Sequence, residues 1–335
     1  MADPTDVGRL GHRYFPIIAN FSTGEEETIS RAQSIEFGTT HTTEKIYELG
    51  RVGPIGSAQD PTDLRCTFEV NLYEELRSEF VLSGKVVATD TSYNMGDVVD
   101  EDDVGIYVLI RDAATGALTD EVKYANCVTT ELAWRFAVGA VCATTITVEG
   151  TAGSWMTTPI HGAQTLDPDS IGGAKGKEAR IWFGSAGSAP DATERAFRLQ
   201  SFNIRATFPV QTVRELGRRN IVGKLLEPVD VTVDFDVAAA DEQPHGTFFE
   251  ALGGGGGYDL TDTVAQHIFI RLYDPDAAEA ATVIRAWEVH NCRPTATTPV
   301  RAQVRGLSTY RYTLTSEAEA ITDSGGMRIF KGDIA

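Results

Sequence analysis

Lysine is scarce in this sequence. Only seven of the 29 basic residues are lysines, whereas aspartate and glutamate together number 48 and the formal net charge is −19. A nucleic-acid-binding surface needs clustered Lys and Arg side chains, so this composition argues against a firm grip on nucleic acid. Few lysines with abundant acid fit a protein from a very salty cytoplasm, and they equally fit a surface that maintains solubility or repels a polyanion.

Long hydrophobic runs are also missing. No stretch approaches the roughly 18–20 apolar residues that a membrane span needs, and the segment from Met1 to Asp6 lacks the basic and apolar regions of an export signal. We therefore expect a protein without membrane insertion that is made and assembled in the cytosol. A hydrophobic content of 42% over 335 residues is enough for two domains, each with its own core.

Motifs for catalysis and metal binding are absent as well. The four cysteines have no CxxC pair and no zinc spacing, and the six histidines are dispersed, so we expect structural roles for both residue types. The glycine-rich stretch 172–178 is not a phosphate loop, because Glu178 stands where Ser or Thr must follow Gly-Lys. The acidic run 97–103 lacks the spacing of a calcium loop, which favours a solvated loop over a cation site. We predict no catalytic residue, no cofactor and no metal, and hence no enzyme.

The sequence does contain a diverged copy of itself. Residues 31–70 align without a gap on residues 198–237, at a constant offset of 167, and thirteen of the forty positions are identical. Average composition gives roughly three identities by chance. The match continues at nearly the same offset, with Asn126-Cys127 and Asn291-Cys292 each following an apolar stretch. A duplication of this length indicates tandem domains rather than a solenoid.

Each copy has the pattern of a long β-hairpin. In the second copy Val231, Val233 and Phe235 alternate with polar residues, a period of two that is typical of a strand with one buried face. Glycines and a proline between the two strands predict a projecting tip. The fold class is therefore mainly β, with two tandem copies of a small antiparallel sandwich or barrel, each with a long hairpin and one short helix (residues 74–82 and 247–252). The predicted organisation is an N-terminal arm (1–30), a first domain (31–150), a linker or arm (151–190) and a second domain (191–335).

The order of these features resembles the tail tube proteins of tailed viruses, in the form that fuses two tube domains in one chain. The resemblance rests on the Gln-Ser strand, the hairpin with Glu-Leu-Gly near its tip, the alternating return strand, the short helix and the later strands. It implies a virion structural protein, the major tail tube subunit. Three chains would form a trimeric, pseudo-sixfold ring, and the rings would stack into a conduit through which DNA passes without specific binding. The implied partners are further copies of the chain and other tail proteins at the tube ends.

The resemblance also assigns two sets of residues. The hairpin tips would contact the next ring; the positions concerned are Glu48, Gly50, Arg51, Gly56, Pro61, Glu215, Gly217, Arg218, Gly223 and Pro228. The solvent-facing acids of the return strands would line the lumen; these are Asp63, Glu69, Asp230, Asp234 and Asp236. Carboxylates at such positions repel phosphate, although the same pattern also fits an ordinary solvent face that discourages edge-to-edge aggregation.

Two alternatives to the tube subunit remain open from the sequence. One is a different β-rich virion component, such as a distal tail or baseplate adaptor, which copy number per particle would distinguish from a tube protein. The other is a glycan-binding tandem sandwich, which would need an export signal and exposed aromatic platforms. The four tryptophans do not cluster in the sequence, which disfavours this second alternative.

Overall fold

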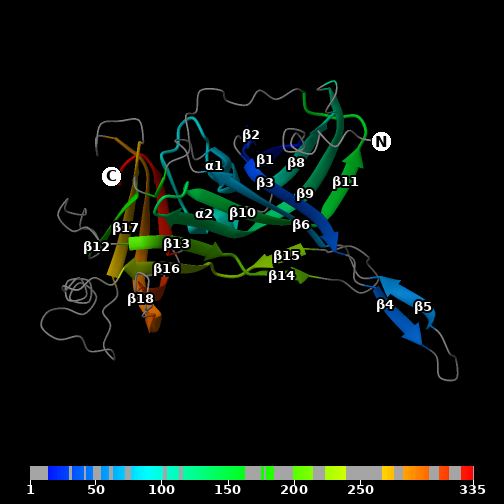
Figure 1. The fold of residues 1–335 in the computed structure, drawn as a ribbon. Coiled ribbons are helices and arrows are strands. Elements are labelled where there is room, and N and C mark those ends of the chain that lie inside the picture. The colour runs from blue at the N-terminus through cyan, green and yellow to red at the C-terminus, as the bar shows by residue number, and fades with distance from the viewer. Residues whose placement is uncertain are drawn as a thin grey trace, which may run out of the picture.

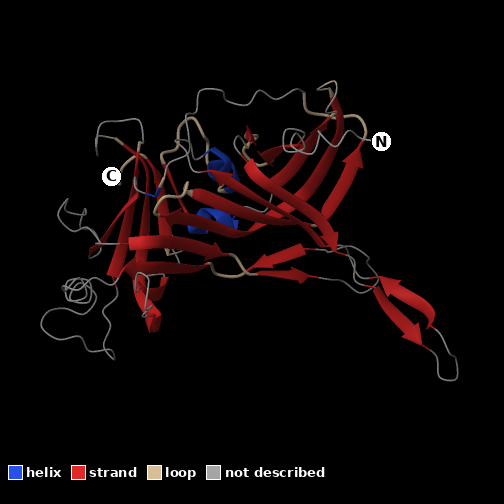
Figure 2. Cartoon of the chain, in the orientation of Figure 1, coloured by secondary structure: helices blue, strands red, loops and turns tan. Residues whose placement is uncertain are grey.

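The structure is a computed structural model of the chain. It describes residues 14–29, 32–40, 43–47, 54–59, 63–71, 77–100, 104–112, 115, 117–162, 175–176, 179–184, 199–213, 223–238, 266–274, 282–301, 309–316 and 326–334. These residues are mainly β, with a large antiparallel sheet and two short helices, as the sequence predicts (Figure 2).

The elements follow the chain in two runs (Figure 1). The first run is β1 (Tyr14–Asn20), β2 (Glu26–Thr28), β3 (Ala32–Thr40), β4 (Thr43–Tyr47), β5 (Pro54–Gln59), β6 (Asp63–Asn71), α1 (Arg77–Leu82), β7 (Ser92–Asn94), α2 (Met95–Asp100), β8 (Val104–Arg111), β9 (Leu118–Ala137), β10 (Ala143–Gly150) and β11 (Ala152–Met156). The second run is β12 (Ala179–Gly184), β13 (Leu199–Thr207), β14 (Val210–Val213), β15 (Gly223–Leu226), β16 (Asp230–Ala238), β17 (Gln266–Tyr273), β18 (Val283–Arg301), β19 (Thr309–Ser316) and β20 (Met327–Lys331).

Eight strands form the central sheet, in the order β18-β19-β16-β13-β9-β10-β6-β3. This order is one four-strand pattern used twice, because β18, β19, β16 and β13 occupy the same relative places as β9, β10, β6 and β3. The two halves meet where β13 pairs with the second half of β9. We call this pairing the internal seam.

Strand registers repeat between the two runs. Pairing of β3 with β6 starts at Ala32↔Val70 and shifts before Ser34, and pairing of β13 with β16 starts at Leu199↔Val237 and shifts before Ser201. Each position in the second pair lies 167 residues after its counterpart. The hairpins β4–β5 and β14–β15 also share one register at that offset. The duplication seen in the sequence thus extends to backbone hydrogen bonding.

The long strands β9 and β18 repeat a local distortion. Both β8–β9 and β17–β18 change register at two equivalent places, and the first change leaves Asn126 and Asn291 with positive φ angles of 49° and 45°. Asparagine adopts this left-handed backbone more readily than most residues do. The shared Asn-Cys dipeptide of the sequence therefore marks a β-bulge in each run.

Four strands lie in the segments that the sequence assigns to an N-terminal arm and to a linker or arm, namely β1, β2, β11 and β12. β1, within residues 1–30, pairs with β8 and is buried along most of its length, and β12, within residues 151–190, pairs with β17 in the matching register. The aligned residues 31–70 and 198–237 do not include β1 or β12, because these two strands match in pairing but not in sequence.

The core lies on one face of the central sheet and follows the period-two pattern. Leu64, Cys66 and Phe68 of β6 are buried, as are Val233 and Phe235 of β16, whereas the residues between them are partly or fully exposed. All four cysteines are buried and free, which confirms the expectation that they act as small apolar side chains. Among the residues described, no helix has the length and apolar character to cross a membrane.

A buried polar cluster joins the two runs. Glu79 of α1 accepts hydrogen bonds from Tyr93 Oη (2.9 Å), Trp134 Nε1 (3.2 Å) and Arg285 Nη1 (3.2 Å). The Glu79 and Arg285 side chains are each only 3% exposed. Because a buried charge needs a partner, this ion pair holds α1 against β18, more than 200 residues later in the chain. The helix predicted over 74–82 is present as α1, and its predicted counterpart over 247–252 lies outside the described residues.

Candidate assembly surface: a polar sheet face and two open edges

The face of the central sheet opposite the core is almost entirely polar. We call it the polar face. The described side chains on it include those of Ser34, Glu36, Arg65, Thr67, Glu69, Asn71, Glu131, Arg135, Thr145, Thr147, Glu149, Ser201, Asn203, Arg205, Thr232, Asp234, Asp236, Arg293, Arg311, Thr313 and Thr315, with Ala133 and Ala137 between them. None of these residues is a lysine, and none carries an aromatic or branched aliphatic side chain. A strand side without apolar residues does not pack on a core, so this face meets water or a polar partner.

Several charges on the polar face are paired. Arg135 Nη2 lies 3.0 Å from Glu69 Oε1, and Arg311 donates to both carboxylate oxygens of Asp236 at 2.9 and 3.1 Å. The Asp236 carboxylate also accepts from Ser201 Oγ at 2.7 Å. These neighbours hold the pKa of the Arg311 guanidinium above its usual value, chiefly through the hydrogen bond to Asp236. The face therefore carries hydroxyl groups and ion pairs. The return strands alone would have indicated an unbroken row of acids.

The predicted lumen acids can be placed in part. Glu69, Asp234 and Asp236 are half-buried on the polar face, Asp230 is exposed at the start of β16, and Asp63 starts β6 with its side chain outside the described residues. Sequence reasoning found these acids through the alternation of the return strands. It missed the arginines that pair with them, because those come from strands β9 and β19.

The predicted hairpin tips fall mostly outside the described residues. The positions that do so are Glu48, Gly50, Arg51, Pro61, Glu215, Gly217 and Arg218. Gly56 pairs with Ile46 in the β4–β5 ladder, Gly223 pairs with Val213 in the β14–β15 ladder, and Pro228 is exposed before β16. Figure 1 shows the β4–β5 hairpin extending well away from the central sheet.

The central sheet ends in two edges without a described partner. Among the residues that the structure describes, β3 pairs with β6 alone, and the second half of β18 (residues 292–301) pairs with β19 alone. An open edge presents a row of backbone N–H and C=O groups that can bind a further strand. The two open edges are the counterparts of β13 and of the second half of β9, which pair with each other in the internal seam.

The internal seam shows how such edges fit together. Phe202 lies opposite Phe136 and Ile204 opposite Trp134 on the core side, with the Phe136 and Phe202 rings 6.1 Å apart. On the polar side Arg205 Nε contacts Glu131 Oε1 at 3.2 Å across the seam. The seam therefore joins the two halves through backbone hydrogen bonds, apolar packing and an ion pair.

Comparisons with known proteins give a partial likeness. No family model matches the chain, and no curated protein matches it. Among solved structures, a chain of the PVC sheath-tube complex of an extracellular contractile injection system, in its extended state, matches at 10% identity with a TM-score of 0.32, covering 47% of this chain and 100% of that one. A chain of the anti-feeding prophage baseplate matches at 15% identity with a TM-score of 0.31, covering 46% and 92%, and one of the anti-feeding prophage cap at 9% and 0.30, covering 44% and 89%. TM-scores this low assign no role to the chain.

Proposed function

We propose that this chain is the major subunit of a virion tail tube, in which three copies close a pseudo-sixfold ring and the rings stack into a conduit for DNA. The single observation that carries the proposal is the internal seam. It pairs two strands whose counterparts, β3 and the second half of β18, are the open edges of the same sheet. The two open edges of the sheet thus repeat the two strands of the internal seam. A chain with such edges is suited to join further copies of itself, head to tail.

The repeated registers specify the contact between copies. In the internal seam Arg205 lies opposite Ala133 and Asn203 opposite Arg135. The equivalent positions on the open edges are Gly38 with Thr298 and Glu36 with Val300. Strand β3 of one copy would therefore meet β18 of the next with Gly38 directly opposite Thr298.

The polar face supports a water-filled lumen. Three copies contribute eight central strands each, well beyond the about 16–18 strands at which β-barrels already enclose water. With the core on the outer side, the polar face would line that space. Three arginines of this face are held in ion pairs with acids, so the face offers phosphate little net attraction, which suits a conduit that must not hold its cargo. The proposal assigns the chain no reaction.

A disulfide trap tests the register. In the double variant Gly38→Cys/Thr298→Cys, the paired Cα atoms would lie about 4.5–5.5 Å apart, within the range that a disulfide spans. Gly38 has room for the new side chain, since nothing lies within 4 Å of a Cβ placed there. Mild oxidation should give covalent dimers and closed trimers on non-reducing gels, and electron microscopy should show stacked rings.

The matched control is Gly38→Cys/Arg293→Cys, which moves the second thiol five residues along β18 and should not cross-link. The native cysteines are buried and should contribute no background. Equal cross-linking of both variants, or a purely monomeric protein at high concentration, would contradict the proposal.

A further inference from the structure

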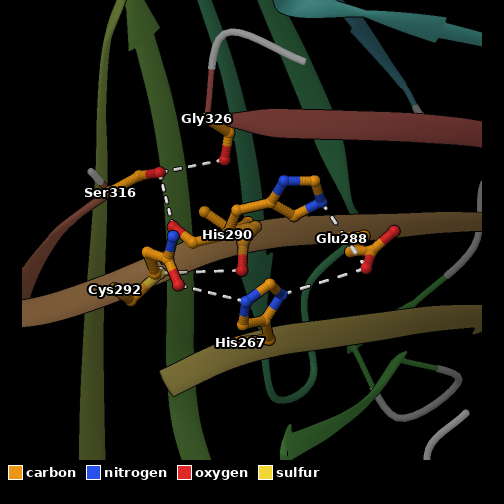
Figure 3. Close-up of polar contacts among 8 residues, drawn as sticks. His267, Glu288, His290, Cys292, Ser316 and Gly326 are labelled. Atoms are coloured by element: carbon orange, nitrogen blue, oxygen red, sulfur yellow. Dashed lines mark hydrogen bonds and ion pairs between the residues drawn. The ribbon is translucent and has the colours of Figure 1, made fainter. Parts of the chain in front are cut away.

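Three ligand-type side chains gather at the bulge of β18, in a group that the sequence did not reveal. His267 lies on β17, and Glu288 and His290 lie two residues apart on β18, all on the side of these strands away from the core (Figure 3). Glu288 Oε1 is 3.5 Å from His290 Nε2 and 4.0 Å from His267 Nδ1. One ligand atom from each residue falls within 4.8 Å of the other two. We call this group the His-Glu-His cluster.

The backbone under the cluster is held firmly. His290 N donates to Gly326 O at 2.9 Å, and His290 O accepts from Ser316 Oγ at 2.6 Å, so both polar groups of that residue are fixed (Figure 3). Gly326 has a φ of +82°, and a Cβ there would come within 2.6 Å of Ser316 Oγ. A binding site needs such support, because its side chains must keep their geometry while no ion is bound.

The hydrogen bonds of the histidines favour a cation between them. His267 Nε2 lies 3.2 Å from Asn291 Oδ1, an acceptor, so this nitrogen carries a proton. In the neutral imidazole the remaining nitrogen, Nδ1, then turns its lone pair toward Glu288 Oε1. Ligand histidines are oriented in this way, through an outer hydrogen bond on the second ring nitrogen.

The first run of strands provides an internal comparison. The positions equivalent to His267, Glu288 and His290 carry Gly105, Lys123 and Ala125, yet the register changes and the positive-φ asparagine are the same. The bulge therefore does not require the His-Glu-His cluster. Its presence in one run only indicates a role other than shaping the strand.

We propose that His267, Glu288 and His290 bind a divalent transition metal ion of the zinc type, with a fourth position open to water or another ligand. Two imidazoles and one carboxylate are a common zinc ligand set, and bond lengths of about 2.0–2.2 Å place tetrahedral ligand atoms about 3.4 Å apart. The observed separations exceed this by up to about 1.4 Å, which small side-chain rotations can close. The side chains are 6%, 17% and 19% exposed, so the site is sheltered but reachable.

Titration of zinc chloride into the chelator-treated full-length protein tests the proposal directly. We expect one ion bound per chain by calorimetry, a rise in melting temperature with zinc, and a tetrahedral absorption spectrum with cobalt in place of zinc. Binding should weaken in acid, because protons compete with the metal ion for the ligand atoms.

The variants His290→Ala and Glu288→Gln should each bind zinc at least about 100-fold more weakly. His290→Ala reproduces the residue found at the equivalent position of the first run, so a folded protein is expected. The control is His161→Ala, which removes a histidine paired with Glu121 (2.8 Å) in the first run and should leave zinc binding unchanged. Absence of zinc binding in the wild type, or equal binding in all three variants, would overturn the assignment. Neither outcome bears on the tube proposal, which does not involve this cluster.

Discussion

At the scale of single residues, the contact between Glu79 and Arg285 is the most consequential in the core. The Glu79 carboxylate accepts hydrogen bonds from tyrosine, tryptophan and arginine side chains that lie on three other elements. Such a cluster is stable only when complete, since removal of one member leaves a charge without a partner in a nonpolar setting.

We predict that Arg285→Ala lowers the free energy of unfolding by about 3–5 kcal/mol, because it strands the Glu79 carboxylate. Denaturation by urea, followed by fluorescence, measures this change. The double variant Glu79→Gln/Arg285→Met should recover part of the loss, since it removes both charges together. A double variant that is destabilised by the sum of the single effects would show that the pair is not coupled.

The buried thiols give a second prediction at this scale. Burial raises the pKa of the Cys66 and Cys127 thiols to about 12, from 9.0. Because the folded pKa lies above the unfolded value, folding favours the protonated thiol, and this contribution is complete below pH 9 and lost as the pH rises toward 12. Native protein at pH 8 should therefore resist iodoacetamide, whereas unfolded protein should react at all four cysteines; mass spectrometry counts the adducts. Rapid labelling of folded protein would contradict this account.

At the scale of elements, the bulges of β9 and β18 let one long strand serve two pairings. The first half of β9 pairs with β8 and β11, and its second half pairs with β10 and β13. Asn126 lies between these halves in the left-handed conformation. The change of partner thus depends on a residue that tolerates that backbone.

We predict that Asn126→Val costs about 1–2 kcal/mol of stability, because a β-branched residue is strained at positive φ. Asn126→Gly should change the free energy of unfolding by less than about 0.5 kcal/mol, since glycine adopts the same backbone freely. Chemical denaturation of the two variants beside the wild type is sufficient. Equal effects of valine and glycine would indicate that the Asn126 side chain, and not its backbone, is what matters.

Much of the element pattern could be predicted from the sequence, and the reasons are local. Alternation in residues 230–237 and the apolar run at 268–273 depend on which side of a strand each residue occupies, and both are strands here. The internal seam, the arginines facing Glu69 and Asp236, and the His-Glu-His cluster join residues from distant segments. Their sequence spacing carries no periodic signal, so only the registers reveal them. The pairing of β1 with β8 likewise joins segments some 90 residues apart.

At the scale of the whole molecule, the net charge of −19 sets the response to salt. Repulsion among unpaired acids destabilises the compact chain, and salt screens it within about 8–10 Å. Exposed ion pairs such as Arg135–Glu69 are weakened by the same screening, but each contributes at most about 1 kcal/mol. Acids exceed bases by 19, so relief of repulsion should dominate.

We predict that the melting temperature rises steadily from low salt to molar potassium chloride, because salt screens the repulsion among the excess acids. Differential scanning calorimetry across the series measures it, with sucrose as an uncharged control for general solute effects. A melting temperature that falls with salt would mean that the ion pairs of the polar face outweigh the repulsion.

The internal seam has one more consequence, for genetics. In the proposed ring, this kind of strand pairing would occur twice. Within the chain it has Arg205 and Glu131 beside it, and between chains, at the open edges, Gly38 and Ala296 take their places. A mutation at the internal seam should impair folding of the chain, whereas a mutation at the open edges should leave a soluble, well-folded monomer that does not assemble. Folding and assembly can thus be altered by separate mutations. A duplicated gene permits this, whereas a single-copy ancestor would not.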